Sequence, residues 1–122
     1  MYTEQRIDPF AGGRILFFDR YALDYLAAYG GREAIFEQIC HPALIRLKEY
    51  DELHGTSFIR TLSTYLSCNM NAVKTAGALF IHRSSFINRM QRIRELVSLD
   101  LEDPDERLYL NLSFKIFRSE FL

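Results

Sequence analysis

The sequence is poor in cysteine, has no tryptophan and has no long apolar run. Its two cysteines, Cys40 and Cys68, form neither a metal-binding pattern nor a disulfide framework. No apolar stretch approaches the roughly 20 residues that cross a bilayer, and no signal-peptide segment follows the first six residues. We therefore expect a soluble, cytoplasmic protein with no membrane partner.

The features of an enzyme are also missing from the sequence. The three histidines are scattered, neither cysteine has an evident activating partner, and no glycine-rich phosphate loop or nucleophile motif is present. We expect no catalytic activity, no cofactor and no metal. The 122 residues do include 48% hydrophobic and 25% charged side chains, which suffices for one compact domain and excludes a disordered tail.

Helical periodicity runs along almost the whole chain and predicts an all-α bundle of about seven short helices. The exception is a short strand over 14–18, and we expect residues 1–18 to be an extended lead-in, the remnant of an upstream domain. The helical domain is expected over 19–122. Its first helices are expected at about 19–29, 32–40 and 42–54, followed by a fourth that Thr56 or Ser57 caps.

The last helix has the clearest start in the sequence. Asp103 can cap it, Pro104 suits its first turn, and Glu106 can reach back to the amide of the capping residue. The spacing predicts that this helix buries Leu108, Leu112 and Ile116.

A helix, a tight turn and a second helix are predicted over 71–97. Asn71 can cap the first helix, and the small side chains of Ala76 and Gly77 allow the second helix to cross it closely. Leu79 and Ile81 are expected to point into the joint. The second helix, from about Arg83 to Leu96, has one apolar face, formed by Phe86, Met90, Ile93 and Val97.

Positive charge is concentrated in this segment. Residues 71–96 contain five basic residues and one glutamate, a net charge of +4, whereas the segments on both sides are acidic. The exposed start of the second helix carries side chains that read base edges in a major groove. We expect DNA contacts from Arg83, Ser84, Ser85, Ile87 and Asn88 to bases, from Lys74 and Arg92 to phosphates, and from His82 and Asn71 at the two helix starts.

Two of the side chains on this helix keep alternative roles. His82 can contact a phosphate or cap the helix. Arg89 lies only about 60° from Phe86 on a helical wheel, at ~100° per residue. Two roles are therefore open for Arg89: a buried structural pair with a carboxylate such as Asp51, or a contact to DNA.

Four segments, in the order 61–66, 75–85, 88–93 and 99–104, the last followed by Arg107 and Leu108, resemble the C-terminal helix-turn-helix domain of PucR/CdaR-type bacterial transcriptional regulators. The upstream segment 50–56 matches the same pattern, and the second helix also resembles Fis-type domains. The resemblance covers about residues 15–117. It implies a DNA-binding output domain, usually attached to an N-terminal sensory region, that acts on genes of purine, sugar-acid or similar small-molecule metabolism.

The sequence departs from the family pattern at three positions. Ser85 stands where threonine is usual, which keeps the hydroxyl group. Asn88 stands where tyrosine is usual, which alters base preference or weakens a packing contact. Ser98 replaces a common helix-ending glycine, which affects the local cap and not the fold.

We expect the domain to bind double-stranded DNA as a homodimer, because one short recognition helix reads too few bases for adequate specificity. Any small-molecule effector is expected to bind a domain outside this chain. The alternative is a protein-interaction or dimerisation module that has the same helical fold and does not read DNA.

Overall fold

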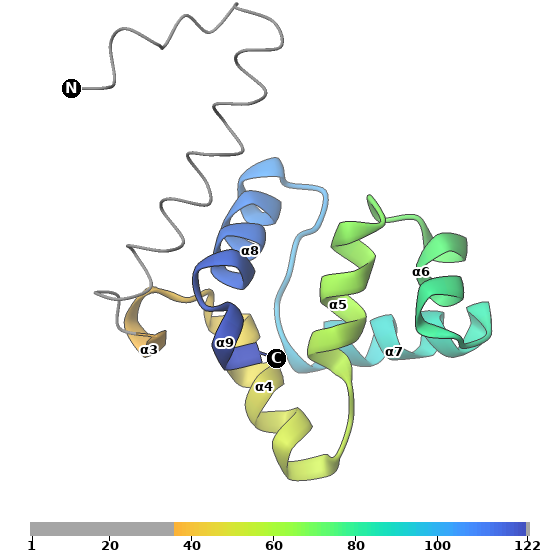
Figure 1. Cartoon of the computed structure of the whole chain (residues 1–122), viewed down its shortest axis with the longest axis horizontal. Helices are drawn as coiled ribbons and strands as arrows, with labels where there is room; N and C mark the ends of the chain where they lie inside the picture. The colour runs from red at the N-terminus through yellow and green to blue at the C-terminus, as the bar shows by residue number, and fades with distance from the viewer. Residues whose placement is uncertain (1–35, 122) are drawn as a thin grey trace, which may run out of the picture. The chain divides into compact units, whose positions relative to one another are not determined.

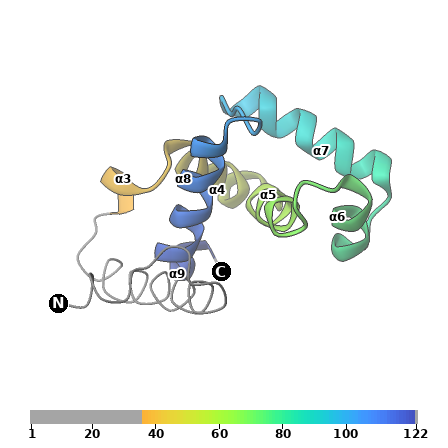
Figure 2. The same cartoon turned by 90° about the horizontal axis from the view of Figure 1, so that it is seen from above.

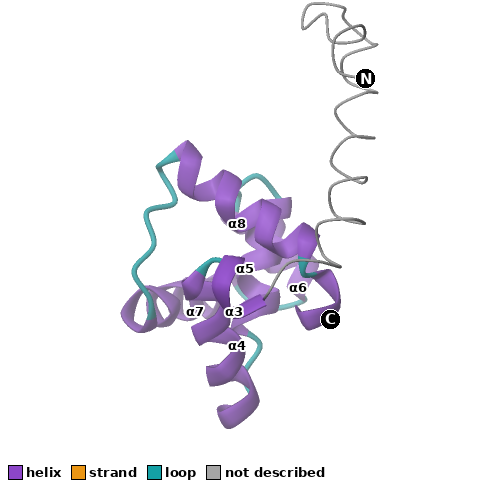
Figure 3. Ribbon diagram, turned by 90° about the vertical axis from the view of Figure 1, so that its left-hand side faces the viewer, coloured by secondary structure: helices purple, strands orange, loops and turns teal. Residues whose placement is uncertain are grey.

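The computed structural model describes residues 36–121, which form helices joined by short loops and contain no strand within that range (Figures 1 and 3). The helices are α3 (Phe36–Ile39), α4 (Pro42–His54), α5 (Phe58–Ser67), α6 (Ala72–Leu79), α7 (Arg83–Leu96), α8 (Pro104–Ile116) and α9 (Arg118–Phe121). The prediction of an all-α bundle of about seven short helices is confirmed. The predicted strand over 14–18, the first predicted helix and the boundary between 18 and 19 lie outside the described residues.

The core is formed around α5, which lies between α6 and the group of α4, α8 and α9 (Figure 1). Side chains from four helices are fully buried there: Leu44, Leu47, Leu62, Ile93 and Leu110. Each such leucine or isoleucine contributes about 1.5–3 kcal/mol through removal from water. Cys40 belongs to the same buried set, and burial raises the pKa of its thiol to about 11, so this cysteine is protonated at neutral pH and serves packing.

The start of α5 is capped by a carboxylate from the preceding helix. Gly55 ends α4 in the left-handed conformation, with φ 69°, and reverses the chain. The Asp51 carboxylate then accepts hydrogen bonds from the amides of Phe58 and Ile59, each at 2.9 Å, and from the Thr56 hydroxyl. The prediction that Thr56 or Ser57 caps this helix is therefore wrong, because the charged oxygens of Asp51 take the amides and Ser57 makes no side-chain cap bond.

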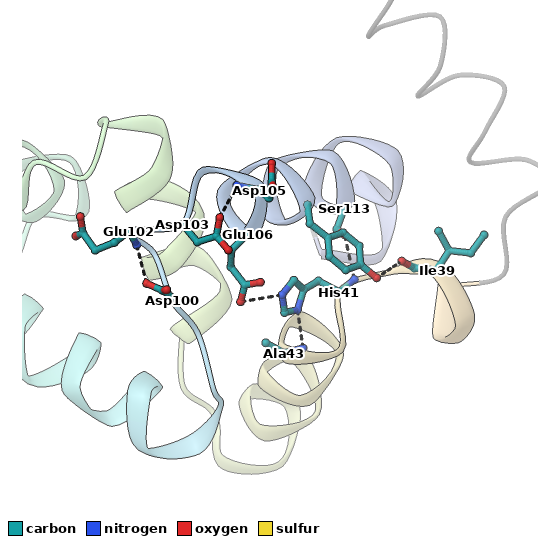
Figure 4. Close-up of polar contacts among 10 residues, drawn as sticks. Ile39, His41, Ala43, Asp100, Glu102, Asp103, Asp105, Glu106 and Ser113 are labelled. Atoms are coloured by element: carbon teal, nitrogen blue, oxygen red, sulfur yellow. Dashed lines mark hydrogen bonds and ion pairs between the residues drawn. The ribbon is translucent and has the colours of Figure 1, made fainter.

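The start of α8 agrees with the sequence in part. Asp103 caps the helix by accepting from the amide of Asp105 at 2.9 Å, and Pro104 occupies the first turn, as predicted. Glu106 does not reach back to the amide of Asp103, which donates to the Asp100 carbonyl instead. The Glu106 carboxylate lies 3.3 Å from Nε2 of His41 (Figure 4).

The predicted buried face of α8 is also wrong. Leu108 is 56% exposed, Leu112 and Ile116 are half-buried, and the buried positions are Leu110 and Ser113. The cause is a polar anchor: the Ser113 hydroxyl accepts a hydrogen bond of 3.0 Å from the backbone amide of His41 (Figure 4), which turns this side of the helix toward α4.

His41 joins the N-terminal end of α4 to α8. Its ring nitrogen Nδ1 accepts from the amide of Ala43 at 3.0 Å and so caps α4, while Nε2 faces Glu106 (Figure 4). The ring also lies against Tyr109, whose hydroxyl donates to the Ile39 carbonyl at 2.7 Å. These contacts hold α4 and α8 against each other, although the two helices are far apart in the sequence. None of the described helices is long and apolar enough to span a bilayer.

Candidate nucleic-acid interface

Helices α6 and α7 form the helix-turn-helix that the sequence predicts over 71–97. The Asn71 side chain caps α6 by accepting from the amide of Lys74 at 2.9 Å. At the other end Phe80 adopts the left-handed conformation, with φ 57°, and the amide of Ile81 donates to the Ala76 carbonyl at 3.0 Å. This pair of features ends α6 and turns the chain into α7 within three residues.

The crossing of α6 and α7 needs one small residue and not two. Ala76 is buried, as expected. Gly77 is exposed, and a Cβ atom placed there would have no neighbour within 4 Å, so the expected role of Gly77 in the crossing is wrong. A helical position four residues from another faces the same side, and Gly77 shares the outer face of α6 with Val73. Leu79 is buried in the joint and Ile81 is half-buried.

The inner face of α7 is the predicted one. Phe86, Met90, Ile93 and Val97 are all buried, and the Phe86 ring lies 5.2 Å from the Tyr65 ring of α5. This packing fixes the rotation of α7 about its axis. The first two turns of the helix therefore present their remaining side chains outward.

Those outward side chains are the predicted base-reading set. Arg83, Ser84, Ser85 and Asn88 are exposed, and Ile87 is 47% exposed. Across residues 36–121 none of the five makes a side-chain hydrogen bond or ion pair. His82 is exposed at the N-cap position and its side chain makes no cap bond, so the structure gives it no capping role. The structure thus brings six predicted residues together at one helix start.

The predicted phosphate contacts differ in their surroundings. Lys74 is exposed on the first turn of α6 and has no ion pair within the described part. Asn71 is exposed too, but its side-chain oxygen is already the cap of α6, which leaves its amide group for other contacts.

Arg92 is held by other residues of the domain. Its guanidinium donates to the Tyr50 hydroxyl at 3.1 Å and to the Glu95 carboxylate at 3.2 Å, and it lies 5.8 Å from the centre of the Tyr50 ring. The hydrogen bond with Tyr50, followed by that with Glu95, raises the pKa of the Arg92 guanidinium above its ordinary value. A phosphate contact by Arg92 would have to compete with Glu95.

Arg89 is connected to α5 and not to Asp51. Its Nη1 atom donates to the Thr61 hydroxyl at 3.2 Å, and the side chain is half-buried. Of the two alternatives open for Arg89, the pair with Asp51 is not formed, because the Asp51 carboxylate binds the start of α5. Thr61 also donates to the Ser57 carbonyl, so Arg89 is attached to a fixed point of the scaffold.

Sequence reasoning missed two features near this surface. Tyr50 on α4 orients Arg92 and stacks on His54, with ring centres 4.0 Å apart. Phe80, in the turn between α6 and α7, is 89% exposed, and Val73 of α6 is 64% exposed. The match of segment 50–56 to the family pattern could have pointed to Tyr50. No sequence pattern predicts that a phenylalanine in a turn is exposed.

We expect the substitution Phe80→Gly to stabilise the domain by about 1 kcal/mol. A left-handed conformation is unfavourable by roughly 1–2 kcal/mol for a residue with a Cβ atom, whereas glycine adopts it freely. The Phe80 ring is exposed, so its burial stabilises the fold too little to offset this strain. Urea denaturation followed by circular dichroism measures the change. Val73→Ala, which alters an exposed apolar side chain of α6 without backbone strain, is the control. Destabilisation by Phe80→Gly would mean that the ring makes a stabilising contact.

The family comparison agrees with this geometry. The model of the PucR C-terminal helix-turn-helix domain matches residues 58–116, which contain α5 to α8. We refer to residues 58–116 as the PucR-type domain, after the family that they are similar to. The domain is therefore of the kind that transcriptional regulators use as their DNA-binding output. Helix α4, with Asp51 and Tyr50, precedes the segment that defines this PucR-type domain.

The chain is similar to three bacterial regulators in particular. It is 28% identical to the purine catabolism regulatory protein of Bacillus subtilis (strain 168) over an alignment of 107 positions that includes 71% of this chain and 20% of the relative. It is 38% identical to the carbohydrate diacid regulator of Escherichia coli (strain K12) over 73 residues, 60% of this chain and 18% of the relative.

The third is the proline-responsive transcriptional activator PutR of Bacillus subtilis (strain 168), which is 34% identical over 77 residues, 63% of this chain and 19% of the relative. The chain spans about a fifth of the length of these curated relatives. No solved structure gives a significant match. All three relatives are regulators by name, and PutR is a transcriptional activator, which points away from an enzyme.

Proposed function

We propose that this PucR-type domain binds double-stranded DNA in a sequence-specific manner and places α7 in the major groove. The observation that carries the proposal is the first part of α7, where five exposed side chains have no partner among residues 36–121 while the opposite face is buried. Arg83 would pair with guanine, Asn88 with adenine, and Ile87 would contact a thymine methyl group. Ser84 and Ser85 supply hydroxyl groups that donate or accept, and His82 lies at the helix start beside the backbone.

The positive charge near α7 supports contacts to phosphates around this helix. Lys74 at the start of α6 and the N-terminal end of α7 both favour negative charge. We assign Lys74, Arg92 and Asn71 to the DNA backbone, with Arg92 in competition with Glu95 and Asn71 acting through its amide group. Such contacts position the helix without reading sequence.

Two copies of the domain are proposed to bind a two-fold symmetric operator. One helix start reads a few base pairs, and half-sites separated by about 34–36 Å, one turn of B-DNA, let two copies add their specificity. In this proposal the chain is the output part of a cytoplasmic bacterial regulator of small-molecule metabolism, since its relatives include a purine catabolism regulator and a carbohydrate diacid regulator. An effector would act on a domain outside this chain.

We expect the salt dependence of DNA binding to identify the phosphate contacts. The slope of log Kd against log salt concentration should fall in magnitude by about one when Lys74 is replaced by alanine, because each phosphate contact releases roughly one counterion. Fluorescence anisotropy with a random 20-base-pair duplex is the measurement. Arg118→Ala on α9 removes the same charge on the side of α5 opposite α7 and should leave the slope unchanged (Figure 2). Equal slopes for Lys74→Ala and the wild type would contradict the assignment.

A further inference from the structure

A hollow of about 550 Å³ lies between α5 and the C-terminal helices α8 and α9. Its volume is in the range of pockets that hold small organic molecules, about 300–1,000 Å³. The hollow is separate from the DNA-binding surface, because α7 and α9 lie on opposite sides of α5 (Figure 2). It has no role in the function proposed above.

One part of the lining of the hollow is apolar and aromatic. Ile59 of α5 is buried and lines the hollow together with Phe114 of α8 and Phe121 of α9. The two phenylalanine rings meet edge to face, with centres 5.3 Å apart. Phe121 also packs on Phe36 at 5.6 Å, so its ring is supported from behind. These walls offer an apolar surface to an aliphatic or aromatic body.

Among residues 36–121, the charged side chains that line the hollow are all cationic. Arg60 comes from α5, Lys115 from α8 and Arg118 from α9. Arg60 and Arg118 are exposed, and neither makes a hydrogen bond or ion pair inside the described range. Guanidinium groups bind carboxylates and related anions through paired hydrogen bonds, and an adjacent apolar wall strengthens that attraction.

Negative charge begins just beyond these walls. A second hollow shares Ile59 and Phe121 with the first. Its charged lining is three carboxylates, of Asp51, Glu52 and Glu120, against one cation, Lys48, which pairs with Glu52. A long polyanion, such as a nucleic acid strand or an acidic membrane surface, would be repelled there. A small anion that stays on the side of Arg60 and Arg118 would not.

We propose that the hollow between α5, α8 and α9 binds a small organic anion with an apolar or aromatic body. The anionic group lies between Arg60 and Arg118, and the body packs on Phe114 and Phe121. Ser63 and Asn111 line the same hollow and supply hydrogen-bond donors to the rest of the molecule. A ligand here touches α5, the helix whose Thr61 holds Arg89 of α7.

Titration of the full 122-residue chain with 8-anilinonaphthalene-1-sulfonate, an aromatic sulfonate that fluoresces in apolar sites, tests the proposal. We expect saturable binding of one molecule and a loss of about tenfold or more in affinity for the double variant Arg60→Ala/Arg118→Ala. The uncharged analogue N-phenyl-1-naphthylamine should bind the wild type more weakly and should not respond to the double variant. Arg83→Ala, on the other side of α5, is the matched control and should bind the sulfonate as the wild type does.

Circular dichroism of each variant establishes that the helices are intact, and Arg118→Glu provides a second variant in which repulsion replaces attraction. Amide chemical shifts of Ser63 and Phe114 should move on addition of the probe. The proposal is overturned by non-saturable binding, by equal affinity of the double variant, or by shifts confined to α7. It is also overturned if an acidic peptide or a DNA duplex, and not small aromatic carboxylates, displaces the probe.

Discussion

Replacing Asp51 with alanine is expected to lower the free energy of unfolding of this domain by about 3 kcal/mol. The carboxylate accepts hydrogen bonds from two amides at the start of α5 and from the Thr56 hydroxyl. Bonds to a charged acceptor contribute about 1.5–3 kcal/mol each, and removal of one shared acceptor gives less than their sum. Because α5 supports α6, α7 and α8, loss of its cap should weaken the whole helix-turn-helix.

Urea denaturation followed by circular dichroism measures this effect, with two comparisons. Asp51→Asn keeps a neutral acceptor and should cost less than Asp51→Ala. Glu52→Ala removes a neighbouring carboxylate that pairs with Lys48, an exposed pair of the kind that contributes about 0–1 kcal/mol. Equal losses for Asp51→Ala and Glu52→Ala would contradict the capping role.

Replacing Arg83 with alanine is expected to weaken binding to a specific operator by about 5- to 150-fold, since a bidentate arginine–guanine contact contributes roughly 1–3 kcal/mol of discrimination. The fold should be unaffected, because Arg83 is exposed and has no partner among the residues described. Binding to a random duplex should change much less, since base contacts add little there. Preference at one base position of each half-site should relax.

Arg94 gives a matched control on the same helix. It is exposed in the last turn of α7, so Arg94→Ala removes the same charge from the same helix at the end away from the proposed base contacts. We expect only a small, salt-dependent loss from it. Anisotropy titrations of the operator and of a random duplex, at one salt concentration, compare the two variants. Equal losses for Arg83→Ala and Arg94→Ala would mean that α7 contributes charge and not base readout.

The features that the sequence predicts well are local ones. The caps Asn71 and Asp103, the proline at the start of α8 and the apolar face of α7 are all confirmed, because each depends on residues a few positions apart. The exposure of Arg83, Ser84 and Ser85 follows from the same periodicity, because it is the complement of the face that Phe86 and Met90 bury.

The features that the sequence predicts wrongly depend on partners far along the chain. Ser113 is buried in place of Leu112 because it binds the amide of His41, 72 residues earlier. Glu106 faces His41 and not its own helix start. Arg89, for which the sequence leaves two roles open, binds Thr61 from 28 residues away. Residue spacing within one helix cannot predict these contacts, because they form only when two helices pack together.

The start of α5 shows a different limit. Thr56 and Ser57 have the right chemistry and the right position for a cap, yet a charged oxygen is the stronger acceptor for amides at a positive helix end. The motif over 50–56 combines an acid that caps, a glycine in the left-handed conformation and a hydroxyl that donates to the acid. The pattern of this motif is visible in the sequence, but the capping role of Asp51 is seen only in the folded structure.

The central claim is that the exposed start of α7 reads DNA sequence. The most direct test is selection of preferred sites from a randomised duplex pool at low salt, by the wild type and by the double variant Arg83→Ala/Ser85→Ala. We predict that the wild type enriches a short two-fold symmetric motif with half-sites about 10 base pairs apart, and that the double variant loses this motif while its helices stay intact. If the wild type enriches no motif at concentrations where it is dimeric, the claim is contradicted and the domain is an interaction module that has the helix-turn-helix fold without DNA readout.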